Sequence, residues 1–87
     1  MITGLQIRSA RAALKWSASE LAARSVVSLP TIQRLEKTDG VPPSRSSTLM
    51  EIQAVFEAAG VEFIGAPDDR PGIRVATKPK YAEQQHG

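Results

Sequence analysis

Two helix-start signals lie so close together in this chain that they dictate how the residues between them fold. Ser17 is followed three residues later by Glu20, and Ser28 is followed by Pro30 in what would be the first helical turn. A serine at an N-cap accepts a backbone N–H, and proline is tolerated in the first turn because its missing N–H has no partner there. The first of these helices must end around residues 24–25, which leaves a short turn between two short helices.

Further helices are predicted on both sides of this pair. Thr3 and Gln6 form a capping-box pattern, so a helix is expected from about Thr3 to Lys15. The second helix of the pair runs out near Lys37, and a longer helix later ends at Gly60, where a left-handed residue is favoured. The apolar residues recur at helical spacing: Ile7, Ala10 and Leu14, then Ile32 and Leu35, then Leu49, Ile52, Val55, Phe56 and Ala59.

After Gly60 the apolar residues recur every two positions instead of at helical spacing, and this change predicts a β-hairpin. Apolar and charged residues mostly alternate over residues 61–64 and 73–76, on either side of a glycine- and proline-containing stretch at 65–72 that is expected to be a long loop. A single register pairs apolar residues with each other on one face of the two strands and opposite charges on the other face. It pairs Val61 with Val75, Phe63 with Ile73, and Glu62 with Arg74.

These elements predict a mainly α protein with one small core. Residues 1–60 form four helices and contain the helix-turn-helix at 17–36, residues 61–76 form the hairpin, and residues 77–87 are expected to be a disordered tail because they have little to bury. No apolar run is long enough to span a membrane, and the N-terminus does not resemble a secretion signal, so a cytoplasmic location is expected.

Charge is divided unevenly along the chain. Residues 1–50 carry seven basic and three acidic residues, a net charge of +4, whereas residues 51–87 carry four basic and six acidic residues, a net charge of −2, which together give the total of +2. A basic half of this kind hints at a polyanionic partner. There is no cysteine and the one histidine is His86, so an enzyme, a metal site and a cofactor are not expected.

The segment from Ser17 to Glu36 resembles the helix-turn-helix motif of the lambda-repressor-like Cro/CI (XRE-like) family. The matching positions are Leu21 and Ala22 in the first motif helix, Val27 and Ser28 at the end of the turn, and Thr31, Ile32, Arg34, Leu35 and Glu36 in the recognition helix. With its flanking helices the resemblance covers about residues 3–60. It implies a four-helix DNA-binding domain, here followed by a C-terminal β-hairpin.

Two positions depart from the family pattern. Ala18 stands where the family usually has a glutamine that grips DNA, and Val26 stands where it usually has a glycine with positive φ. A β-branched residue at positive φ is strained by about 1–3 kcal/mol. Either the turn is built differently here or the protein tolerates that strain.

In a helix-turn-helix the second helix enters the major groove and its outward residues reach base edges. With Ile32 and Leu35 facing inward, the expected base contacts are Leu29, Pro30, Gln33 and Arg34. The expected phosphate contacts are Ser28, Thr31, Lys37, Ser44, Arg45 and Ser46, with Arg8 and Lys15 from the first helix. The alternative for each of these residues is that it is an ordinary solvent-exposed surface residue. For Leu29 the alternative is that it shields the core between the helices.

The resemblance also implies a structural ion pair and a dimer. Family members often pair an arginine of the first helix with the acid that closes the recognition helix, and Arg11 and Glu36 occupy those positions. They usually bind DNA as two-fold dimers. The open strand edges of the hairpin favour it as the interface, with these residues: Val61, Phe63, Ile73 and Val75. The alternative is a hairpin that only caps the core of a monomer.

The function expected from the sequence is that of a sequence-specific transcriptional regulator. Its partners would be double-stranded DNA and a second copy of the chain, with no membrane and no small-molecule ligand. The alternative is a protein-interaction module, such as an antitoxin or antiactivator, in which DNA binding is secondary or lost. Steep salt dependence of DNA binding would distinguish the regulator from the interaction module.

Overall fold

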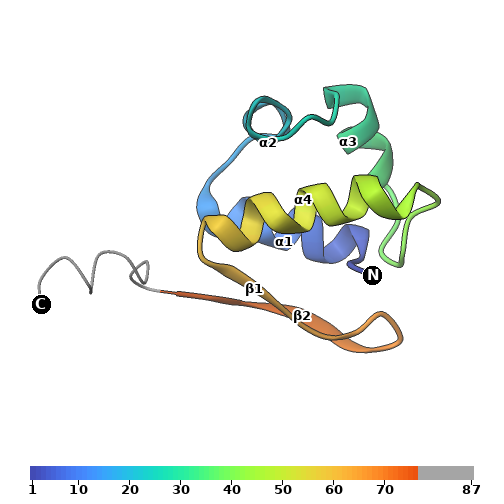
Figure 1. Ribbon diagram of the computed structural model, residues 1–87. Helices are drawn as coiled ribbons and strands as arrows, with labels where there is room; N and C mark the ends of the chain where they lie inside the picture. The colour runs from blue at the N-terminus through green and yellow to red at the C-terminus, as the bar shows by residue number, and fades with distance from the viewer. Residues whose placement is uncertain (77–87) are drawn as a thin grey trace, which may run out of the picture.

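The computed structural model describes residues 1–76, and the expectation of a disordered tail at 77–87 lies outside the described residues. Four helices precede a two-stranded antiparallel sheet (Figure 1). The helices are α1 (Gly4–Leu14), α2 (Ala18–Arg24), α3 (Leu29–Leu35) and α4 (Ser46–Ala58), and the strands are β1 (Val61–Ala66) and β2 (Asp69–Val75). The predicted fold class is confirmed.

The helix boundaries follow from local chemistry. Thr3 and Gln6 make both bonds of a capping box at the start of α1, and Gly60 has φ +97 after the end of α4. Ser17 accepts from the backbone N–H of Glu20, but the carboxylate of Glu20 binds Arg24 rather than returning to the cap. Ser17 and Glu20 thus form only one of the two hydrogen bonds of a capping box.

The helices and the hairpin share one core. Its fully buried members come from all four helices, from the α2–α3 turn and from the first residue of β1, and include Ile7, Leu21, Ile32, Leu35, Leu49, Ile52, Phe56 and Val61. Aromatic rings extend it toward the sheet. Trp16 stacks on Phe56 at 5.6 Å between ring centroids, and Phe56 meets Phe63 edge-on at 5.9 Å. Because Val61 and Phe63 are part of this packing, the hairpin is not a separate unit.

The hairpin has the predicted register but not the predicted loop. Val61, Glu62 and Phe63 face Val75, Arg74 and Ile73, as expected. The strands then continue through most of residues 65–72, so the long loop was wrong, and only Pro67 and Asp68 form the turn. A bulge at Gly65, with φ +78, absorbs the register shift, and the backbone carbonyl of Arg70 leaves no room for a side chain there.

One polar side chain ties the hairpin to the helices. The amide of Gln6 donates to the carbonyl oxygens of Gly72 at 2.8 Å and Ile64 at 3.2 Å, one on each strand. The same side chain accepts the backbone N–H of Thr3 at 2.9 Å. Gln6 therefore joins the start of α1 to both strands at once.

Candidate nucleic-acid interface

The predicted reading face of α3 points to solvent. Ile32 and Leu35 are buried, and this leaves the other side of the helix outward. Pro30, Gln33 and Arg34 are exposed, and Leu29 is half-buried. Ser28 caps the helix, with its hydroxyl accepting the backbone N–H of Thr31 at 3.4 Å and donating to the Thr31 hydroxyl at 3.0 Å.

The turn that orients α3 is built without a left-handed residue. Within residues 1–76 the non-glycine residues with positive φ are Lys15 and Arg70, so Val26 carries no such strain. Ser25 closes the turn instead. Its hydroxyl donates to the carbonyl of Leu21 at 2.9 Å and accepts the N–H of Val27 at 3.2 Å. The sequence left two alternatives, a turn with a different structure or a strained Val26. The structure shows the first of them.

An ion pair holds the end of α3 against α1. Arg11 Nε lies 2.8 Å from Glu36 Oε2, and Arg11 Nη2 lies 2.7 Å from Glu36 Oε1, the paired geometry that the resemblance implies. Arg11 also donates to the carbonyl of Trp16 at 3.0 Å. The hydrogen bond that Arg11 donates to Glu36 and the charge of that carboxylate raise the pKa of Arg11, against the opposing effect of partial burial. The guanidinium thus acts as a permanent cation.

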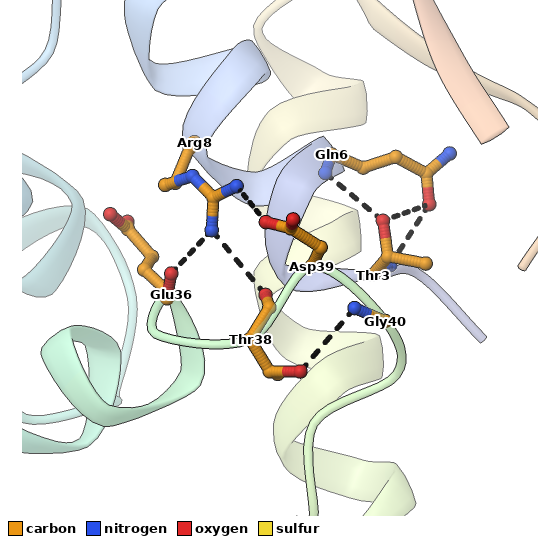
Figure 2. Close-up of polar contacts among 7 residues, drawn as sticks. All are labelled: Thr3, Gln6, Arg8, Glu36, Thr38, Asp39 and Gly40. Atoms are coloured by element: carbon orange, nitrogen blue, oxygen red, sulfur yellow. Dashed lines mark hydrogen bonds and ion pairs between the residues drawn. The ribbon is translucent and has the colours of Figure 1, made fainter.

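Arg8 lies differently from what its predicted phosphate contact requires. Its guanidinium donates to the carbonyl oxygens of Glu36 and Thr38 and pairs with the carboxylate of Asp39 (Figure 2). These three bonds fasten the segment after α3 to α1. The same segment approaches Gly4, whose N–H donates to the carbonyl of Gly40 at 2.9 Å. Arg8 therefore holds this loop against α1, and its charge is already paired with that of Asp39.

Two of the predicted phosphate contacts, Ser28 and Thr31, line a groove, whereas Ser44 and Ser46 lie outside it. An open cavity of about 530 Å³ lies between the α2–α3 turn and the first turns of α4. Ser28 and Thr31 line it from one side. The rest of its lining is Val26, Val27, Ser47, Thr48 and Glu51. Thr48 and Glu51 were not singled out by the sequence, because only the packing of α3 beside α4 brings them to this site.

Four basic residues in the described range, 1–76, have no ion pair. Within residues 1–76, ion pairs engage the arginines at positions 8, 11, 24, 70 and 74. The basic residues of that range without an ion pair are Lys15, Arg34, Lys37 and Arg45, and all four side chains are exposed. Each is a residue that the sequence predicts to contact DNA. The remaining predicted contacts, Ser44 and Ser46, flank Arg45 at the start of α4 and are also exposed.

A helix-turn-helix family model matches residues 7–61, which is more than half of the chain. The protein belongs to the Cro/CI-like, XRE-type helix-turn-helix family. This is a family of DNA-binding regulatory domains and not of enzymes. A search of curated proteins found no match. In the part of the chain that the structure describes, no helix has the length and apolar character needed to cross a membrane.

The hairpin residues predicted at a dimer interface of this helix-turn-helix protein are not equally accessible. Val61 is 1% exposed and belongs to the core, and Phe63 packs against Phe56. Ile73 is half-buried and Val75 is 40% exposed. Phe63 is half-buried as Ile73 is, so the two strands differ in exposure only between Val61 and Val75.

Proposed function

We propose that this helix-turn-helix protein is a sequence-specific transcriptional regulator that inserts α3 into the major groove. The observation that carries the proposal is the charge distribution: in residues 1–76 the exposed cations without an ion pair are Lys15, Arg34, Lys37 and Arg45. Unpaired surface cations supply the salt-dependent part of DNA affinity. The other basic residues in this range serve ion pairs within the fold.

Two kinds of contact are proposed for α3 and its surroundings. The exposed side of α3 reads bases: Arg34 suits guanine, Gln33 suits adenine, and Leu29 with Pro30 offers apolar contact to a thymine methyl group. The phosphate contacts set register rather than sequence. They are Ser28, Thr31, Lys37, Ser44, Arg45 and Ser46, with Lys15 at the end of α1.

The regulator acts as a two-fold dimer in this proposal. One recognition helix contacts only a few base pairs. Two copies on half-sites about one helical turn apart contact enough base pairs for sequence-specific binding. Residues 1–60 are the DNA-binding unit and the hairpin at 61–76 joins the two copies. The cytoplasm is the location that fits this activity.

Selection of bound sequences from random duplex DNA tests the proposal. We expect a palindromic site, and binding to it should weaken steeply as salt rises. Arg34→Ala should relax the base preference at one position of the selected site and reduce the binding free energy for that site by about 1–3 kcal/mol. Lys37→Ala should weaken binding to all DNA sequences alike and reduce the salt slope by about one. Arg70→Ala is the control, because this exposed arginine at the start of β2 lies outside α3 and α4 and pairs with Asp69.

The alternative function gives a different result in the same experiment. A protein-interaction module, such as an antitoxin or antiactivator, would enrich no palindrome and its weak DNA binding would not depend on Arg34. That outcome would overturn the proposal.

A further inference from the structure

Val26 is unusual among the apolar side chains of the described residues. At 89% exposure it is the most exposed large apolar side chain of residues 1–76, and it lies in the turn between α2 and α3. An apolar side chain left in water contributes little to folding, because the hydrophobic effect acts only on surface that is buried. Single exposed valines are common on proteins, so the role of Val26 depends on its surroundings.

The turn accommodates this side chain because Ser25, rather than a glycine, closes it. The Ser25 hydroxyl donates to the carbonyl of Leu21 at 2.9 Å and accepts the Val27 N–H at 3.2 Å. Val26 is not among the residues with positive φ, so its β-branched side chain causes no backbone strain. This chain thus presents an apolar side chain at a position where the family usually has none.

Val26 lines the same groove as the hydroxyls at the start of α3. Val26 and Val27 line this open groove of about 530 Å³ together with Ser28 and Thr31. The Ser28 hydroxyl accepts the Thr31 N–H and donates its own proton to the Thr31 hydroxyl. The proton of the Thr31 hydroxyl takes part in neither bond, so it can be donated to a phosphate oxygen. The groove therefore offers an apolar surface beside a hydrogen-bond donor.

This groove lies on a flank of α3 rather than on its outward face. Consecutive helical residues are about 100° apart, so Thr31 lies midway between the exposed Pro30 and the buried Ile32. A helix with its side chains is about 10–12 Å across, and the major groove is about 12 Å wide. A helix that fills the major groove has its flanks against the groove walls, and those walls are the sugar–phosphate backbone.

We infer that Val26 is a DNA contact that packs on the apolar carbon atoms of a deoxyribose, next to a phosphate bound by Thr31. The inference rests on the proposed function, because it extends the proposed DNA contacts to the turn before α3. Sugars and phosphates alternate along a strand, so an apolar side chain beside a hydroxyl donor matches two neighbouring parts of one strand.

The charges of the groove favour this placement of sugar and phosphate. Val26 has no donor, and a phosphate oxygen against it would lose hydrogen bonds to water without replacement. Glu51 lines the α4 side of the groove, and its carboxylate has no ion pair in residues 1–76. Repulsion from this carboxylate leaves the phosphate on the Thr31 side of the groove.

Val26→Thr tests the contact, because it keeps the shape of the side chain and replaces one methyl group with a hydroxyl. The residue is exposed, so Tm should stay within about 3 °C of the wild type. Affinity for the selected duplex should fall about fivefold, since apolar contact is lost and a hydroxyl is desolvated. Val41→Thr is the matched control at a valine that is 43% exposed and does not line the groove, and it should bind as the wild type does.

The site preference and the salt slope identify the kind of contact. Loss of a sugar contact should weaken binding to all sequences alike, since sugars carry no sequence information. The salt slope should not change, because a valine releases no counterion from the DNA. Val26→Thr should therefore differ from Arg34→Ala, which changes a base preference, and from Lys37→Ala, which lowers the slope.

A modified duplex locates the sugar. An arabinonucleotide carries a 2′-hydroxyl on the side of the sugar that faces the major groove. Placed at one nucleotide at a time, it should weaken binding by the wild type about fivefold at one nucleotide of each half-site, where the hydroxyl meets Val26. The loss should be at least threefold smaller for Val26→Thr, and this difference isolates the contact from any general effect of the modified sugar.

Three outcomes would overturn the inference: equal affinity of Val26→Thr and the wild type, a changed base preference or salt slope, and arabinonucleotide losses that are the same for both proteins at every position. A wild-type protein that selects no DNA sequence would contradict the proposed function and the inference with it. The three outcomes above, in a protein that does select a site, contradict the inference alone.

Discussion

Arg11 and Glu36 meet side by side, with two hydrogen bonds of 2.8 and 2.7 Å between the guanidinium and the carboxylate. Arg11 belongs to α1 and Glu36 follows the last residue of α3, so this contact holds the end of α3 against α1. The side chains are 24% and 10% exposed, which makes the pair largely sheltered from solvent. Removing one partner of such a pair leaves the charge of the other partner unpaired in a site that water reaches poorly.

Glu36→Ala should therefore destabilise the fold strongly. We expect a loss of about 3 kcal/mol, the lower end of the range for sheltered pairs because Arg11 is partly exposed, and a fall in Tm of more than about 10 °C. Thermal unfolding followed by circular dichroism measures this. Glu20→Ala is the control, because its pair with Arg24 lies on the surface and is worth under about 1 kcal/mol. Equal melting temperatures for the two variants would contradict the structural role of Glu36.

The same pair should add no pH dependence through Arg11 in the ordinary range. The folded-state pKa of Arg11 is raised, chiefly by its hydrogen bond to Glu36. A raised pKa stabilises the fold at every pH below the ordinary arginine value, and this contribution is lost only as pH rises through the raised value. Between about pH 6 and 9, the stability difference between wild type and Arg11→Met should stay constant in urea titrations. A difference that grows or shrinks across this range would show that another group titrates with Arg11.

Gly4→Ala should be destabilising although alanine favours helices. A Cβ at Gly4 would lie 2.6 Å from the carbonyl oxygen of Leu35 and closer still to that of Thr38. Displacing this backbone costs about 1–3 kcal/mol, which exceeds the gain of up to about 1 kcal/mol in helix propensity. Gly40→Ala is the matched control, since no atom lies within 4 Å of its Cβ position. Urea unfolding monitored by the fluorescence of Trp16 should rank the control as the more stable variant; the reverse order would mean that the loop after α3 moves away freely.

The sequence predicted the features that depend on nearby residues, but not those that depend on contacts between distant parts of the chain. Helix caps such as Thr3 and Ser28 and the hairpin register were predictable, because each depends on residues a few positions apart or on a period of two. The roles of Gly4 and Arg8 were not, since both depend on a loop that lies 28 or more residues further along the chain than Arg8. The strain expected at Val26 was avoided through the side chain of Ser25, a local bond that the family pattern of a turn glycine does not suggest.

Gln6→Glu should loosen the hairpin from α1. The substitution keeps the length of the side chain and the acceptor for Thr3, but it removes the donor and sets a negative charge beside the carbonyls of Ile64 and Gly72. Leaving such groups unsatisfied costs about 1–3 kcal/mol. Hydrogen exchange of the amides of residues 61–75 should accelerate about tenfold or more, ahead of the amides of α4.

Gln53→Glu is the control for this experiment, because it makes the same chemical change on α4. There it replaces an exposed bond to Glu57 with a repulsion between two surface carboxylates, which costs only about 0.5 kcal/mol. Uniform acceleration across the whole chain in Gln6→Glu would mean that the hairpin opens only with global unfolding.

Glu51→Gln should strengthen DNA binding. Glu51 lines the groove that also contains Ser28, Thr31 and Ser47, and in this part of the chain it has no ion pair. If those hydroxyls contact phosphates, the carboxylate repels the DNA backbone. Removing one screened surface charge is worth about 0.6 kcal/mol, or roughly a threefold gain in affinity at moderate salt. Glu57→Gln removes the same charge from an exposed position of α4 that does not line the groove, and it should change affinity less. Fluorescence anisotropy with the selected duplex measures both variants. Unchanged affinity of Glu51→Gln would place the groove away from the DNA backbone.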